Sequence, residues 1–208
     1  MSKERARRIK LLLFDVDGVM TDGTIWFFPA PAGANPSLAA ERAKLADAGG
    51  YAVSSAAWVE AKGFHAHDGT AMSLARLGGL KTGVITKRIS ETVVLRARDL
   101  RLDYVYQGAA DKVSAFEEIL AKEGLTPAEA CYVGDDLIDL PVMRRCGLAV
   151  AVADARPEVK EEAHFVTEHG GGEGAVRDVV EYVLRAQGTW SEAVNRYLSA
   201  RTSDRKDG

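Results

Sequence analysis

The residues most able to do chemistry form a short acidic segment near the start of the chain. Asp15 and Asp17 stand two positions apart directly after an apolar run, and Gly18 follows them. A carboxylate attacks a phosphate dianion only when the negative charges are neutralised, and a hard divalent cation such as Mg²⁺ does this. Asp15 would then be the nucleophile, while Asp17 would protonate the leaving oxygen and later activate water. The pattern favours this interpretation over an acidic loop that only caps a helix.

A second acidic cluster and two single residues fit the same chemistry. Asp135, Asp136 and Asp139 follow another apolar run. Carboxylates this close repel one another unless a cation neutralises them, so we expect metal binding here in preference to a solvated acidic loop. Thr86 offers a hydroxyl to a phosphate oxygen, and Lys112 can neutralise both the phosphate and the nucleophile.

Short apolar runs alternate with amphipathic stretches along the chain. The runs cover residues 11–14, 83–85, 104–106, 131–133, 148–152 and 165–166. Asp68, Ser90 and Asp111 are placed to begin helices, and a final helix fits residues 174–186. Strands that are apolar throughout indicate an α/β, Rossmann-like fold, a parallel sheet with helices on both faces. In such a sheet the ligand lies beyond the carboxyl ends of the strands, where Thr86 and the acidic clusters fall.

One segment interrupts this alternation. Residues 28–56 are rich in Ala, Pro and Gly, with one plausible helix at residues 37–47. The flanking residues 24–28 and 57–64 can pair as a β-hairpin that carries the insertion. We therefore expect a single domain over residues 1–208, with a hairpin flap and its insertion at about residues 24–64.

Composition limits the class of protein. The 208 residues carry a formal net charge of -3, which gives no indication of a nucleic-acid binder. No apolar run approaches the ~20 residues of a membrane span, and the N-terminus lacks the basic-then-apolar order of a secretory signal. Cys131 and Cys146 lie in or beside apolar runs, which is typical of reduced, buried thiols. We expect a cytoplasmic protein that binds neither nucleic acid nor membrane.

Five residues, in their order along the chain, resemble the four motifs of the haloacid dehalogenase superfamily: Asp15, Asp17, Thr86, Lys112 and Asp135. The resemblance implies that Asp15 is the nucleophile and Asp17 the general acid/base, and that Thr86 and Lys112 bind the phosphate. It also implies a Mg²⁺ site made by Asp15, the main-chain carbonyl of Asp17 and Asp135, with Asp139 beside it.

Longer phrases narrow the resemblance to the family of 3-deoxy-D-manno-octulosonate 8-phosphate phosphatases. The phrases are residues 15–23, 106–108 with 111–112, 132–143, 151–155 and 174–177. That family implies a cap-less phosphatase of lipopolysaccharide biosynthesis. It also implies a homotetramer in which the hairpin after the first motif lines a neighbour's active site. The implied substrate is a small-molecule sugar phosphate, 3-deoxy-D-manno-octulosonate 8-phosphate.

The resemblance places substrate-binding positions at five residues: His67, Asp68, Gly69, Arg88 and Arg96. His67, Ser73 and Glu173 stand where the family usually has arginine. Arginine grips a carboxylate bidentately, and none of these three side chains does so. Phosphate-ester cleavage is therefore better supported than recognition of the acid sugar's carboxylate.

Three other functions stay open at this point. The first is a phosphatase for another sugar phosphate, such as a nonulosonic acid 9-phosphate. The second is a non-catalytic partner protein with the same fold, and the third is a phosphotransferase that passes the phosphate to an alcohol. The intact set of aspartates argues against a non-catalytic partner, because carboxylates that repel each other have no structural reason to stand together.

Overall fold

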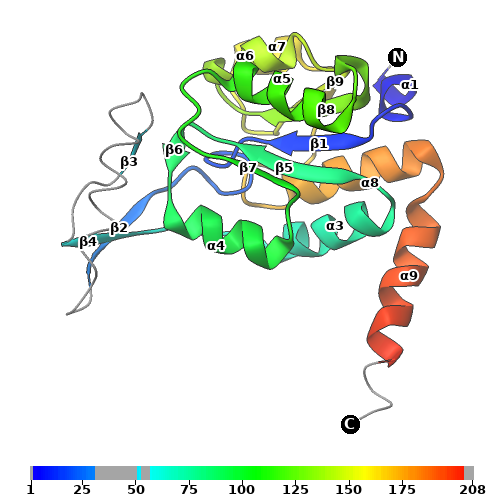
Figure 1. Cartoon of the computed structure of the whole chain (residues 1–208), viewed down its shortest axis with the longest axis horizontal. Helices are drawn as coiled ribbons and strands as arrows, with labels where there is room; N and C mark the ends of the chain where they lie inside the picture. Colours follow the sequence, from blue (N-terminus) through cyan, green and yellow to red (C-terminus); the bar gives the residue numbers. More distant parts are fainter. Residues whose placement is uncertain (1, 31–50, 53–56, 204–208) are drawn as a thin grey trace.

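A parallel β-sheet forms the centre of the protein (Figure 1). The computed structural model describes residues 2–30, 51–52 and 57–203. Within them, the sheet has six strands in the order β10-β9-β8-β1-β5-β7, and all of its pairings are parallel. The strands are β1 (Leu11–Phe14), β5 (Lys81–Ile85), β7 (Tyr104–Tyr106), β8 (Ala130–Gly134), β9 (Leu148–Ala151) and β10 (Phe165–Val166). The predicted α/β fold is confirmed.

The central strands are apolar because both of their faces are covered. Every residue of β1, β8 and β9 is buried, so these strands cannot show the alternation of a half-exposed sheet. In Figure 1, helices α5 (Lys112–Glu123), α6 (Leu140–Met143) and α7 (Pro157–Glu162) lie on one side of the sheet. Helices α3 (Ala66–Leu77), α4 (Glu91–Leu100) and α8 (Ala175–Gln187) lie on the other.

The helix starts match the sequence in part. Asp111 caps α5, because its side chain accepts a hydrogen bond from the Val113 amide, and Ser90 occupies the N-cap position of α4. The prediction for Asp68 is wrong: α3 begins at Ala66, so Asp68 lies in its first turn. The predicted final helix is α8, but a further helix, α9 (Trp190–Ser203), follows it. Among the described residues, none of the helices is long and apolar enough to cross a membrane.

A two-stranded hairpin stands beside the main sheet (Figure 1). Strand β2 (Trp26–Pro29) pairs antiparallel with β4 (Trp58–Ala61). Strand β4 lies within the predicted flank 57–64, whereas β2 extends one residue beyond the predicted flank 24–28. A second small pairing joins β3 (Tyr51–Ala52) in parallel to β6 (Arg88–Ile89), which follows β5. The helix predicted at residues 37–47 lies outside the described residues.

Candidate active site

The carboxyl ends of three neighbouring strands bring the predicted residues together. Asp15 follows β1, Thr86 follows β5 and Asp135 follows β8, and β1 lies between the other two strands. Parallel neighbours end at one edge of a sheet, so these side chains meet there. A cavity of about 170 Å³ lies at this edge. It is lined by Asp15, Asp17, Thr86, Lys87, Arg88, Asp135, Asp136 and Ile138.

Asp15 is held rigidly. Its main-chain amide donates to the carbonyl of Val133 on β8 at 3.0 Å, which continues the pairing of the strands. Its Oδ1 accepts a hydrogen bond from the Val16 amide at 2.7 Å, and its Oδ2 lies 2.9 Å from Nζ of Lys112. The side chain is only 6% exposed, so the carboxylate has a fixed direction and little contact with solvent.

Lys112 supplies the positive charge next to Asp15. It is the first residue of α5, and its side chain is 3% exposed. Its Nζ donates to Oδ1 of Asp139 at 2.7 Å as well as contacting Asp15. Burial disfavours the charged ammonium, but Asp15 and Asp139 outweigh this and raise the pKa of Lys112 above its ordinary value. The lysine therefore stays protonated between two carboxylates.

Asp139 is the best-connected carboxylate of the site. Its Oδ1 accepts from Lys112 and from the hydroxyl of Tyr132 at 2.8 Å. Its Oδ2 accepts from the main-chain amides of Asp135 and Asp136 at 3.0 and 3.3 Å. With both oxygens occupied in this way, Asp139 is suited to orienting Lys112 and the Asp135 loop, beside the position where a cation would bind.

The acidic residues fit a divalent cation. Asp15, Asp135 and Asp139 each offer an oxygen, and these oxygens lie within 4.8 Å of one another. Burial and the charge of Asp139 raise the pKa of Asp15 to about 7, and burial with Asp139 and Asp15 raises the pKa of Asp135 to about 8. Oδ1 of Asp135 is buried and has no hydrogen-bond partner among the described residues. A hard cation such as Mg²⁺ would satisfy this oxygen and relieve the repulsion.

Gly18 allows the first acidic loop to approach Asp135. Its φ of +87° favours glycine, and a Cβ at this position would lie 2.2 Å from Oδ2 of Asp135. A side chain here would therefore occupy the space of that carboxylate. The turn at Gly18 thus brings the two acidic loops into contact.

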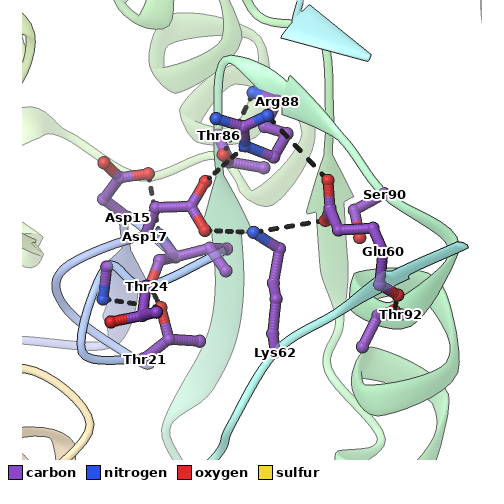
Figure 2. Close-up of polar contacts among 12 residues, drawn as sticks. Asp15, Asp17, Thr21, Thr24, Glu60, Lys62, Thr86, Arg88, Ser90 and Thr92 are labelled. Carbon is purple, nitrogen blue, oxygen red and sulfur yellow. Dashed lines mark hydrogen bonds and ion pairs between the residues drawn. The ribbon is translucent and has the colours of Figure 1, made fainter. Parts of the chain in front are cut away.

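Asp17 lies in a network of ion pairs (Figure 2). Nε of Arg88 donates to its Oδ2 at 3.0 Å, and Nζ of Lys62 donates to its Oδ1. Glu60 contacts both cations, with 3.2 Å from its Oε1 to Nζ of Lys62 and 3.9 Å from its Oε2 to Nη1 of Arg88. The side chains of Lys62 and Glu60 are 0% and 5% exposed.

The predicted substrate-binding residues divide into two groups. Thr86 and Arg88 line the cavity that contains Asp15, and Oγ1 of Thr86 accepts a hydrogen bond from the Arg88 amide at 3.3 Å. Gly69 and Arg96 instead line a separate cavity of about 480 Å³, together with Ser73. Their part in binding the substrate stays a prediction.

His67 and Asp68 are likewise not among the residues that line the Asp15 cavity. Asp68 is buried at the start of α3, and its Oδ1 accepts a hydrogen bond from the main-chain amide of Arg177 at 2.9 Å. Arg177 lies in the first turn of α8, so this carboxylate ties two helices together. Burial raises the pKa of Asp68 to about 6.

Sequence reasoning missed three residues of the site: Lys62, Glu60 and Tyr132. A weak signal existed for each of them. Glu60 and Lys62 are two positions apart at the end of a strand, so both side chains point to the same face. Tyr132 lies within an apolar run, where its hydroxyl needs a buried partner.

Comparisons with known proteins agree with this geometry. The family model of haloacid dehalogenase-like hydrolases matches residues 84–178. The 3-deoxy-D-manno-octulosonate 8-phosphate phosphatase KdsC of Escherichia coli K12 is 38% identical over 189 residues, which cover 91% of this chain and 86% of the relative. The crystal structure of the Yersinia pestis phosphatase of the same name is 36% identical, with a TM-score of 0.75, covering 91% of this chain and 88% of that one.

A second similar structure contains ligands. It is the 3-deoxy-D-manno-octulosonate 8-phosphate phosphatase of Moraxella catarrhalis in complex with a magnesium ion, a phosphate ion and a KDO molecule. That chain is 28% identical, with a TM-score of 0.76, and the match covers 94% of this chain and 97% of the other.

Proposed function

The chain belongs to the 3-deoxy-D-manno-octulosonate 8-phosphate phosphatase family of haloacid dehalogenase-like hydrolases, and on this premise we propose that it is a Mg²⁺-dependent phosphatase acting on that sugar phosphate. The observation that carries the chemistry is the buried group of Asp15, Lys112 and Asp139 beside Asp135 at one sheet edge. The relatives support the choice of substrate. They are named as phosphatases of this sugar phosphate, and each matches most of this chain.

The reaction has two displacements. Asp15 attacks phosphorus, the bond from phosphorus to the sugar oxygen breaks, and Asp17 gives that oxygen a proton. Asp17 then takes a proton from water, whose oxygen attacks phosphorus, and the bond to Asp15 breaks to release phosphate. Lys112 neutralises the transferring group, and Thr86 and Arg88 contact its oxygens.

Two carboxylates and one main-chain oxygen would supply the protein ligands of the metal site. We assign Asp15, Asp135 and the carbonyl of Asp17 as ligands, with Asp139 orienting its neighbours through the contacts described above. When bound, Mg²⁺ supplies the charge neutralisation that lets an anionic nucleophile approach a phosphate dianion. The raised pKa values of Asp15 and Asp135 support this assignment, because both carboxylates are destabilised without a nearby cation.

Assembly and location follow from the family resemblance. We infer a cytoplasmic homotetramer in which the hairpin of β2 and β4 acts as a flap at a neighbour's active site. Several large apolar side chains of the hairpin are exposed in the single chain, which supports an interface there: Trp26, Phe27, Phe28, Trp58 and Val59.

Phosphate release from a panel of sugar phosphates, with Mg²⁺ or with EDTA, tests the proposal. We expect the highest kcat/KM for 3-deoxy-D-manno-octulosonate 8-phosphate and no turnover in EDTA. A preference for a nonulosonic acid 9-phosphate would replace the substrate while keeping the reaction. Transfer of phosphate to an added alcohol in place of water would indicate a phosphotransferase.

Asp15→Asn tests the covalent step, and Asp103→Asn is its matched control. Asp103 lies at the opposite end of the sheet, where it pairs with Lys81. We expect Asp15→Asn to abolish turnover without unfolding the protein, and Asp103→Asn to keep turnover near the wild-type rate. Wild-type activity of Asp15→Asn towards any phosphate ester would refute the aspartyl-phosphate mechanism.

A further inference from the structure

The Asp17 carboxylate has a separate cationic partner on each oxygen. Arg88, which follows β5, donates to Oδ2, and Lys62, which follows β4, donates to Oδ1 (Figure 2). Two partners from different elements fix both the position of a carboxylate and the plane in which it lies. The Asp17 side chain is 24% exposed, so without these contacts it would be free to rotate towards solvent.

Glu60 holds the two cations in place. It lies between Lys62 and Arg88, and its side chain is nearly as buried as that of Lys62. Removing a lysine from water is costly unless carboxylates surround it, and Glu60 gives the buried Lys62 a carboxylate partner in addition to Asp17. Both Glu60 oxygens lack a hydrogen bond within the described residues. The polar contacts of this carboxylate are therefore its ion pairs with Lys62 and Arg88.

A hydrogen bond joins strand β4, which carries Glu60, to helix α4. The hydroxyl of Thr92, in the first turn of α4, donates to the main-chain carbonyl of Glu60 at 3.0 Å (Figure 2). This contact places the end of β4 against α4 and directs Lys62 towards Asp17. Glu60 and Lys62 therefore link the position of the hairpin to the position of the Asp17 carboxylate.

We propose that Lys62 is a positioning residue, which with Glu60 holds the Asp17 carboxyl group in line with the leaving oxygen. The proposal rests on the proposed function, since it assigns Lys62 an effect through Asp17. General acid catalysis needs the acid within hydrogen-bond reach of the atom that it protonates. Loss of Lys62 would leave Asp17 with one partner and allow it to turn away from that atom.

Esters with different leaving groups isolate this effect. An alkoxide, as in a sugar phosphate, needs a proton as it leaves, whereas p-nitrophenolate leaves without one. The parameter kcat/KM includes only the steps up to departure of the leaving group, so it reports the acid function of Asp17 and excludes its later action on water. We expect Lys62→Met to lower kcat/KM about 10–100-fold for the sugar phosphate, within the range of general acid catalysis, and about 3-fold or less for p-nitrophenyl phosphate.

Two further variants complete the experiment. Lys81→Met is the matched control, because Lys81 also pairs with carboxylates but lies at the far end of the sheet and is half exposed. It should leave the ratio of the two kcat/KM values unchanged. The double variant Lys62→Met/Glu60→Gln removes the unpaired buried carboxylate, and it replaces the single variant if the latter does not fold.

Each result decides the inference. A larger loss for the sugar phosphate than for p-nitrophenyl phosphate supports positioning. Equal losses would mean that Lys62 only stabilises the fold, and a faster reaction of the sugar phosphate would mean that Lys62 restrains Asp17 from acting as an acid. Either outcome overturns the proposal. A wild-type protein that hydrolyses neither ester would instead refute the proposed function, which keeps the two failures distinct.

Discussion

Magnesium should stabilise this protein more at about pH 8 than at about pH 5.5, because protons and the cation compete for the same carboxyl groups. The pKa of Asp15 is raised to about 7 and that of Asp135 to about 8, whereas both groups ionise near 3.8 in an unfolded chain. Between these values the metal-free folded protein holds protons that the unfolded chain has released. The free energy of unfolding therefore falls as the pH rises through this window.

The size of the effect follows from the shift of Asp15. One pKa unit corresponds to about 1.4 kcal/mol, and the part of the window between about pH 5.5 and about pH 7 is worth about 2 kcal/mol. For a chain of this length each kcal/mol changes Tm by about 2–4 °C, so Asp15 alone should lower the metal-free Tm by about 4–8 °C, and Asp135 lowers it further. A cation at about 100 times its Kd restores about 2.7 kcal/mol once the carboxylates are free of protons.

Thermal melts in EDTA and in MgCl₂ at the two pH values, with NaCl added to equalise ionic strength, measure this difference. Other titrating groups contribute equally with and without the metal, so the Mg²⁺-dependent change in Tm isolates the site. Asp135→Asn removes one of the two titrating ligands and should reduce the pH dependence of that change. A rise in Tm of the same size at both pH values, or one unaffected by Asp135→Asn, would refute the reasoning.

Three further substitutions test how the site is supported. Gly171→Ala should lower kcat at least about 10-fold in steady-state kinetics. A Cβ at this position would lie 2.0 Å from the carbonyl oxygen of Gly18, so the first acidic loop would have to move. Tyr132→Phe removes a buried hydrogen bond to Asp139 and should lower the free energy of unfolding by about 1–2 kcal/mol in urea titrations. Asp111→Ala removes the cap of α5 and should cost about 1 kcal/mol in the same titrations, with kcat little changed.

Different outcomes would contradict these three predictions. Normal kinetics in Gly171→Ala would show that the loop accommodates the extra atom without moving Asp15. An unchanged free energy of unfolding in Tyr132→Phe or in Asp111→Ala would show that the hydrogen bond removed by that substitution contributes no net stability.

The clustering of the candidate site residues was readable from the sequence because each signal for it is local. An apolar run followed by acids predicts a buried strand that ends in a polar loop, and this holds for Asp15 after β1 and for Asp135 after β8. Parallel strands then require that their carboxyl ends share an edge, so the cluster of Asp15, Thr86 and Asp135 follows from the pattern. The cap at Asp111 is local in the same way.

Other features depend on where distant segments meet. The sequence shows Asp68 before an amphipathic stretch, but the contact with Arg177 on α8 gives its carboxylate a partner across 109 positions, and α3 begins earlier than the pattern suggests. Lys62 is 45 positions from Asp17, and only the register of the hairpin against the main domain brings them together.

The sequence by itself determined the fold class and which candidate groups meet at the sheet edge, because hydrophobic periodicity and strand-end motifs act over a few residues. Tertiary structure alone decided what surrounds Asp17 and what joins Gly171 to Gly18. Those contacts depend on the path of the whole chain, and charged residues such as Glu60 and Lys62 become buried only when that path places them against each other.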